Sequence, residues 1–303
     1  MSATQVTKVQ TLIGHRDCVY ALVAGGESQT IFSAAGDGMV VSWNLEKPEE
    51  GELIAKLPNS VYSLYHDRKE DLLIVGQNYE GIHLLDWKNK KELASLKITS
   101  SFIFDIQQYE NDLLIATGEG SLVVVDRDKW MIKKKILATE KSARAIAIST
   151  QLGVVAIGYS DFYIRVFALD DYRLIKEWKA HANSVFTLQY IPDTHFLISG
   201  SRDAKLKVWD ASADYQQVEE IAAHLYAINH IAFSTNAKHF ATASMDKSVK
   251  VWNTNEMKLL KVIDKARHIG HGSSVNKLLW TTHHNQLLSA SDDRSISVWD
   301  VKF

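Results

Sequence analysis

The sequence contains few of the residues that mark a disulfide-rich, multidomain or strongly charged protein. Its single cysteine, Cys18, excludes an internal disulfide and fits a reducing compartment. Only three prolines, and no long Gly/Ser or charged tract, leave no visible linker in the 303-residue chain. We therefore expect a single domain over residues 1–303. The net charge of -2 gives no general attraction to nucleic acid or to anionic membranes.

Long apolar segments are also missing. No uninterrupted apolar run reaches the roughly 18 residues of a membrane-spanning helix. The N-terminal stretch "MSATQVTKVQTL" has no apolar core of the length found in signal peptides. We therefore expect a soluble cytoplasmic protein without membrane association, and a nuclear location stays open.

One short motif is repeated four times along the chain. In "GSRDAKLKVWD", residues 200–210, an Asp precedes a Trp by six positions, and three other stretches have the same spacing. A His lies 28 residues before each Trp, and a hydroxyl residue lies four before each Asp. The four sets are His15, Ser33, Asp37 and Trp43; His181, Ser199, Asp203 and Trp209; His224, Thr242, Asp246 and Trp252; and His271, Ser289, Asp293 and Trp299.

Three weaker copies fill the gap between the first and second sets. They begin at Val61, Ile103 and Ala143, and an apolar residue replaces the Trp in each. Successive spacings from Trp43 are then 42, 40, 42, 42, 43 and 47 residues. This periodicity predicts seven similar units.

The units have the pattern of β-strands. Alternating apolar residues, as at Leu206 and Val208, favour strands, and no stretch has a convincing helical stripe. Each unit has room for about four short strands, and such a sheet needs neighbours to cover its two apolar faces. Seven sheets arranged radially would satisfy this need as a closed ring. The chain stops before the last unit has its own outer strand, so residues from about Thr7 to Ile13 should complete that sheet. Lysines in the outer strands, such as Lys261, would discourage edge-to-edge pairing.

This pattern of Gly-His or Ala-His, a turn Asp and a closing Trp-Asp or Trp-Asn resembles the WD-repeat family over essentially the whole chain. The resemblance implies an all-β, seven-bladed propeller with four antiparallel strands per blade. It also implies that each His, hydroxyl, Asp and Trp set forms a hydrogen-bonded chain. Units two to four lack these sets, so we expect packing alone to hold them.

The resemblance further implies an upper face that binds peptides or proteins. The matching positions are Tyr20, Tyr62, Phe104, Arg144, Phe186, Arg202, Asn229, Met245, Asn276 and Asp292. Alignment in unit three leaves Phe102 as an alternative to Phe104. The rings could instead plug the channel or pack between blades. A second candidate is the loop "DKARHIGHG" from Asp264, which lengthens the last spacing, although an ordinary solvated loop would explain it too.

Other chemistry is poorly supported. The His, hydroxyl and Asp set occurs four times, and each hydroxyl is expected to lie under a Trp. This indicates a structural role for these residues and not a catalytic triad. No metal-ligand or phosphate-loop spacing occurs, although His283 and His284 are adjacent in the expected first hairpin of the last unit. We therefore predict a non-catalytic scaffold that binds a protein or peptide, with acidic groups on the partner as one option. No cofactor, metal or specific nucleic acid is expected, and the chain would be monomeric or a subunit of a complex. A structural subunit of a larger assembly and a propeller enzyme remain the alternatives.

Overall fold

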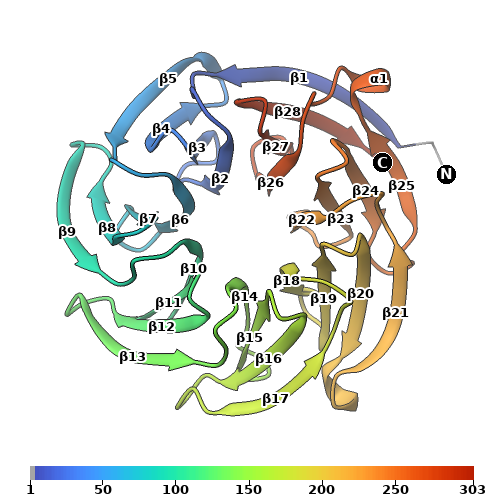
Figure 1. Cartoon of the computed structure of the whole chain (residues 1–303). Helices are drawn as coiled ribbons and strands as arrows, with labels where there is room; N and C mark the ends of the chain where they lie inside the picture. The colour runs from blue at the N-terminus through green and yellow to red at the C-terminus, as the bar shows by residue number, and fades with distance from the viewer. Residues whose placement is uncertain (1–3) are drawn as a thin grey trace. The chain divides into compact units, whose positions relative to one another are not determined.

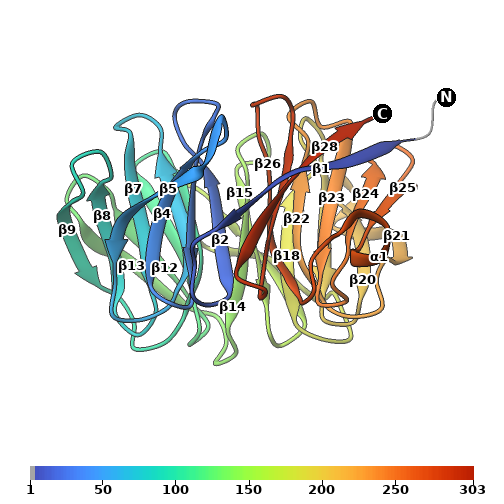
Figure 2. The same ribbon diagram turned by 90° about the horizontal axis from the view of Figure 1, so that it is seen from above.

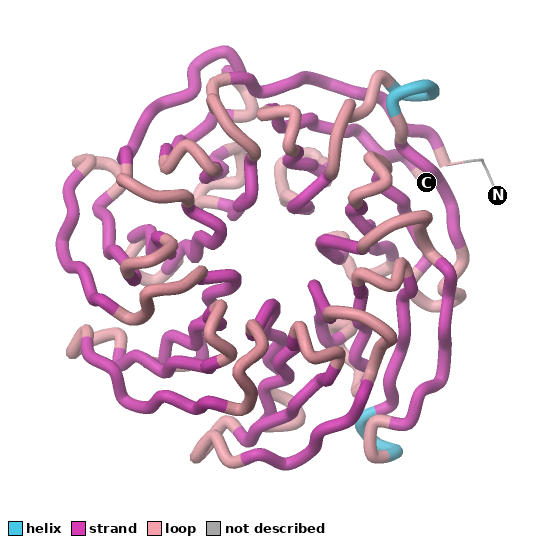
Figure 3. Tube along the Cα trace, viewed as in Figure 1, coloured by secondary structure: helices cyan, strands magenta, loops and turns pink. Residues whose placement is uncertain are grey.

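The computed structural model describes residues 4–303, within which 28 β-strands form seven antiparallel sheets of four strands (Figure 1). In this part of the chain the helical segments are short: η1 (Ala211–Ala213) and α1 (Lys265–His268) (Figure 3). The predicted fold class, an all-β propeller of seven four-stranded blades, is confirmed.

The contacts between residues divide the chain into two compact units. The first unit comprises the described residues up to Gln77, with Ile82–Ser95 and His230–Phe303, and the second comprises Asn78–Gly81 and Leu96–Asn229. The single domain expected over residues 1–303 stays a prediction.

Four sheets lie wholly or mostly in the first unit. Their strands are β1 (Gln5–Ile13), β2 (Val19–Ala24), β3 (Thr30–Ala35), β4 (Met39–Asn44), β5 (Lys47–Lys56), β6 (Val61–Asp67), β7 (Leu72–Gln77), β8 (Gly81–Asp86), β9 (Lys91–Lys97), β22 (Ile228–Phe233), β23 (His239–Ser244), β24 (Val249–Asn253), β25 (Leu259–Ile263), β26 (Val275–Trp280), β27 (Leu287–Ser291) and β28 (Ser295–Lys302). In three of these sheets the strands follow chain order, β2 to β5, β6 to β9 and β22 to β25.

Three sheets lie in the second unit, and each also follows chain order. Their strands are β10 (Ile103–Tyr109), β11 (Asp112–Thr117), β12 (Ser121–Asp126), β13 (Met131–Leu137), β14 (Ala143–Ser149), β15 (Val154–Tyr159), β16 (Tyr163–Ala168), β17 (Leu174–Lys179), β18 (Val185–Tyr190), β19 (Phe196–Ser201), β20 (Lys205–Asp210) and β21 (Gln216–Ala222).

The remaining sheet of the first unit joins the two ends of the chain. Its order is β1-β28-β27-β26, so the N-terminal strand is the outer strand of the last blade. Thr7 pairs with Asp300 and Leu12 with Ile296, with a bulge between Lys8 and Gln10. Figures 1 and 2 show β1, in dark blue, beside β28, in red. The predicted completion of the last sheet by the N-terminal segment is therefore confirmed.

The core lies between neighbouring sheets. Leu12, Trp43 and Val298 belong to one buried cluster that joins the first and last blades. In the second unit, Leu114 and Val155 belong to a cluster that joins two successive blades. Each such buried aliphatic side chain contributes about 1.5–3 kcal/mol, so a blade is stabilised mainly by the blades beside it.

Tight turns connect the second and third strands of the strong repeats. In the first blade the amide of Gly38 donates to Ala35 O over 3.1 Å, and the amide of Met39 donates to Asp37 Oδ1 over 2.8 Å. Gly38 has a φ of +74°, and a Cβ there would lie 2.3 Å from Leu57 O. Gly38 thus fits both the left-handed backbone and the close approach of Leu57 O in this turn.

Candidate functional site

The fifth blade contains the His, Ser, Asp and Trp set in one hydrogen-bonded chain. The Trp209 indole N–H donates to Ser199 Oγ over 2.9 Å, and the same hydroxyl lies 2.8 Å from His181 Nε2. His181 Nδ1 lies 3.0 Å from Asp203 Oδ2. An indole N–H is only a donor, so Ser199 accepts from Trp209. The Asp203 carboxylate is only an acceptor, so His181 carries its proton on Nδ1 and donates a hydrogen bond to Asp203, and Nε2 of the neutral ring accepts from the Ser199 hydroxyl.

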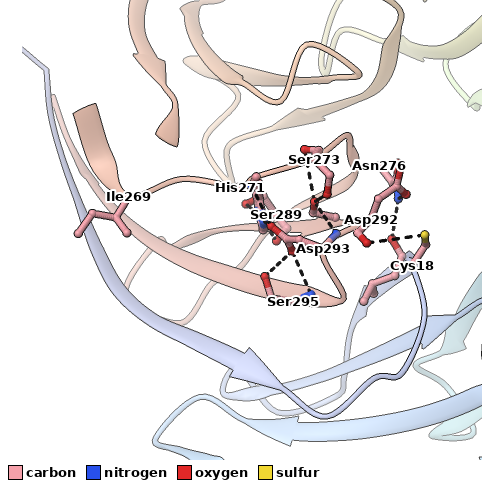
Figure 4. Close-up of polar contacts among 12 residues, drawn as sticks. Cys18, Ile269, His271, Ser273, Asn276, Ser289, Asp292, Asp293 and Ser295 are labelled. Carbon is pink, nitrogen blue, oxygen red and sulfur yellow. Dashed lines mark hydrogen bonds and ion pairs between the residues drawn. The ribbon is translucent and has the colours of Figure 1, made fainter. Parts of the chain in front are cut away.

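The same arrangement recurs in the first and last blades. His15 lies 2.7 Å from Ser33 Oγ and 3.4 Å from Asp37, and the Trp43 indole donates to Ser33 over 2.8 Å. In the last blade, drawn in Figure 4, His271 Nε2 lies 2.8 Å from Ser289 Oγ and Nδ1 lies 2.9 Å from Asp293. The Trp299 indole donates to Ser289 over 2.8 Å. In the sixth blade, Trp252 donates to Thr242 over 3.0 Å.

Burial affects the protonation of the sets in the first and fifth blades. It lowers the pKa of His15 and His181, an effect that Asp37 and Asp203 only partly offset. Burial also acts to raise the pKa of Asp203, but hydrogen bonds from His181 and from backbone amides outweigh it and lower the value to about 2. The resulting pair is a neutral imidazole and a carboxylate. Because Ser199 is fully buried, no substrate reaches its hydroxyl.

Polar contacts also stabilise the second blade, in place of packing alone as predicted. His66 Nε2 lies 2.8 Å from Asp71 Oδ1, and the Trp87 indole donates to the same oxygen over 3.2 Å. Lys88 forms a 2.6 Å ion pair with Asp71. Buried Leu85 stands where other blades have Trp, but Trp87, two residues later, supplies a donor. The expectation of packing alone is therefore wrong for this blade.

The third and fourth blades are joined by a buried side-chain hydrogen bond. The Tyr172 hydroxyl donates to Asp112 Oδ2 over 2.7 Å, and Lys133 forms a 2.6 Å ion pair with Asp112. Arg165 pairs with Asp161 and Glu177, each over 2.8 Å. The expectation that packing alone holds the third and fourth blades is therefore also wrong. Such contacts have no fixed spacing, so the periodic pattern could not indicate them.

The second unit holds the most distinctive of the predicted binding residues. The Arg144 guanidinium carbon lies 3.8 Å from the Phe104 ring centroid and 4.6 Å from that of Phe186. Phe102 lies 5.5 Å from Phe104, and Tyr79 lies 5.1 Å from Phe102, both between ring centroids. We call Tyr79, Phe102, Phe104, Arg144 and Phe186 the aromatic–arginine cluster.

The first unit brings together four of the other predicted residues in two pairs. The ring centroids of Tyr20 and Tyr62 lie 4.5 Å apart. Asn276 Nδ2 donates to Asp292 Oδ1 over 2.7 Å and to Val19 O over 3.1 Å (Figure 4). Cys18 Sγ lies 3.8 Å from Asp292 O, and burial raises the pKa of its thiol to about 11. Cys18 is therefore a thiol and not a reactive thiolate at neutral pH.

The last three predicted residues lie in other strands and turns of the sheets. Arg202 and Met245 are exposed in the turns after β19 and β23, and Asn229 is half-buried in β22. The loop before β22 also carries Leu225 and Tyr226, which are 83% and 61% exposed. Sequence reasoning missed this exposed apolar pair because it follows the His of the repeat and has no spacing signal of its own.

Two further observations concern other classes of site. His283 and His284 lie in the turn between β26 and β27, with ring centroids 4.2 Å apart. Across residues 4–303 no three His, Cys, Asp or Glu side chains are grouped as a metal ion would need. No helix among the same residues is long and apolar enough to cross a membrane.

Known proteins share both the sequence pattern and the fold. The family model "WD domain, G-beta repeat" matches residues 6–44, 172–210, 215–253 and 263–300, just over half of the chain. A solved structure, the WD40 beta propeller domain of Doa1, superposes with a TM-score of 0.87 over 97% of each chain at 17% identity.

Two human proteins have related segments. WD repeat-containing protein 36 from Homo sapiens is 25% identical over 104 residues, 33% of this chain and 11% of its own length. Striatin-3 from Homo sapiens is 24% identical over 200 residues, 66% of this chain and 22% of its own length. The chain thus spans roughly a tenth to a quarter of these relatives. On the four matched repeats and the seven four-stranded blades, the chain belongs to the WD-repeat family.

Proposed function

We propose that this protein is a non-catalytic scaffold that binds a protein or peptide partner through the aromatic–arginine cluster. The observation that carries the proposal is the position of Arg144, stacked between Phe104 and Phe186 at 3.8 and 4.6 Å. All three side chains are half-buried, so each keeps part of its surface at the solvent.

Stacking prepares Arg144 for recognition of an acidic group. The guanidinium carbon lies over both rings. The N–H donors of a guanidinium lie in its plane and match a carboxylate in two parallel bonds. Holding the side chain in one orientation before binding lowers the entropy cost of the complex. The rings also supply apolar area, and aromatic residues with Arg are the usual hot spots of interfaces.

The preferred partner therefore has an acidic side chain beside an apolar one. Phe102 and Tyr79 extend the apolar surface away from Arg144, and Tyr79 is 48% exposed. A single acidic residue without an apolar neighbour would use only part of this surface. Membership of a family of repeat scaffolds supports the same function class.

Two features favour a binding role over catalysis. Each Ser of the complete tetrads accepts the indole N–H of its Trp and is fully buried, so no substrate reaches its hydroxyl. The histidines of these tetrads are buried with them. The groups that an esterase or protease would use are thus structural in this chain.

Affinity capture with matched variants tests this proposal. The chain, an Arg144→Gln variant and an Arg173→Gln control would each be used to capture proteins from a native lysate. Arg173 is exposed and pairs with Asp170 and Asp171, so the control removes the same charge elsewhere. We expect one partner that the control retains and Arg144→Gln loses, with an unchanged melting temperature. Equal capture by both variants would overturn the assignment to Arg144.

A further inference from the structure

The segment Asp264–Gly270 departs from the repeat and forms an ordered turn. It contains α1, and Asp264 caps this helix by accepting from the Arg267 amide over 2.8 Å. The amides of His268 and Gly270 both donate to Asp264 O over 3.1 Å. A Cβ at Gly270 would lie 2.8 Å from the Asp264 carbonyl carbon, so glycine permits this close return.

This turn is also fixed to the neighbouring strand β1. Lys8 Nζ donates to Ile269 O over 3.1 Å, and α1 contacts β1 (Figure 1). Ile269 ends the helix in a left-handed conformation with its side chain 78% exposed. The turn therefore holds its side chains in place before any partner arrives.

A groove of about 390 Å³ lies between this turn and β25. It is lined by four consecutive strand residues, Leu259–Val262, and by Arg267 and His268 from α1. β25 is the last strand of its sheet and is hydrogen-bonded there to β24. A strand in that position has backbone groups on its outer side that can pair with another extended chain.

The groove combines positive charge with an apolar wall. Lys261 and Arg267 supply the charge, and Leu259 is 39% exposed. The nearby acid, Asp264, is engaged as the helix cap and lies 3.6 Å from Arg267 Nε. Burial, and after it the charge of Lys261, lower the pKa of His268; Asp264 opposes this shift and Arg267 adds a smaller lowering effect. His268 Nδ1 is buried and has no hydrogen-bond partner.

We propose that this groove binds an acidic segment of a partner protein, in extended conformation, along β25. A carboxylate of the segment would pair with Lys261 and Arg267, which line the groove. Alternate apolar side chains of the segment would lie against Leu259 and Ile269. A small inorganic anion would satisfy the charges but would leave the strand edge and the leucine uncovered. The site lies in the first unit and does not depend on the Arg144 cluster.

Binding of synthetic peptides tests this inference directly. The probe is a fluorescein-labelled peptide of alternating Glu and Val, compared with its Lys and Val counterpart. Fluorescence anisotropy would be measured with the chain, with Lys261→Glu plus Arg267→Glu, and with Lys69→Glu plus Lys238→Glu. The last pair changes the net charge equally at exposed positions outside the groove.

We expect saturable binding of the acidic peptide to the chain and to the control, and no binding of the basic peptide. Two exposed charge pairs at the upper end of the usual range predict about 30-fold weaker binding to the charge-reversed variant. Methylation of alternate peptide amides should also weaken binding, because it blocks pairing with β25. Melting curves would establish that both variants are folded.

Three results would overturn the inference. They are equal binding by the charge-reversed variant and the control, insensitivity to amide methylation, and displacement by an equal concentration of inorganic phosphate. If melting curves show that the charge-reversed variant is unfolded, the inference is tested instead by NMR on the unmodified chain, through the His268 imidazole signals. They should shift on titration with the acidic peptide, and unchanged signals would reject the site.

Discussion

The Ser199 hydroxyl accepts the Trp209 indole N–H over 2.9 Å while lying 2.8 Å from His181 Nε2. The small Ser199 side chain therefore provides a hydrogen-bond partner for two larger buried side chains. Ser199→Ala should leave the Trp209 indole N–H and His181 Nε2 without a partner and destabilise the protein by about 1–3 kcal/mol. Urea or thermal unfolding measures this loss. Ser100→Ala, at an exposed position, is the control and should change stability by less than about 0.5 kcal/mol. Equal stability of the two variants would show that the hydrogen-bonded set contributes nothing.

Acid should destabilise the protein in two stages. His15 and His181 have pKa values lowered by burial, so the unfolded chain takes up protons first as the pH falls below about 6.5. Asp203 has a pKa of about 2, because hydrogen bonds outweigh the opposing effect of burial. Its contribution is complete above roughly pH 4 and is lost as the pH falls towards 2. Melting temperatures between about pH 8 and pH 4 should fall with acidification. A constant or rising melting temperature would contradict the neutral, buried imidazoles.

Cys18 should react slowly with thiol reagents. Its pKa of about 11 leaves roughly one thiolate in three thousand molecules at pH 7.5, some 300-fold fewer than an ordinary cysteine. A thiolate of higher pKa is about tenfold more nucleophilic, so the net expectation is roughly 30-fold slower reaction than a cysteine peptide. Reaction with Ellman's reagent measures this rate, and unfolding in urea should restore the ordinary value. A native rate equal to that of the peptide would contradict the burial of the thiol.

Much of the fold could be predicted because the residues that define each repeat stand at fixed distances along the sequence. The fixed distance from His to Trp places the two ends of each hydrogen-bonded chain, and β1 completes the last blade as predicted. The stabilising contacts of the weaker blades could not be predicted. Asp71 binds Trp87 and Asp112 binds Tyr172 through positions that no repeat spacing marks.

The candidate site was predictable residue by residue but not in its contacts. The repeat places Phe104, Arg144 and Phe186 at equivalent positions of successive blades. The repeat spacing does not indicate whether these three side chains contact one another, because such contacts depend on the side-chain rotamers and on the separation of the blades. The helix α1 was missed for another reason. Its four residues are too few to produce a helical period, and its formation depends on the Asp264 cap and the return at Gly270.

The most direct test of the central claim is a double-mutant cycle across the interface, once capture has identified a partner. Arg144→Gln in this chain would be combined with replacement of each acidic residue by its amide in the partner's binding segment, and affinities would be measured by titration calorimetry. We predict one acidic residue whose loss couples to that of Arg144 by at least about 1 kcal/mol. Strictly additive effects for every acidic residue would contradict recognition of an acidic group by Arg144.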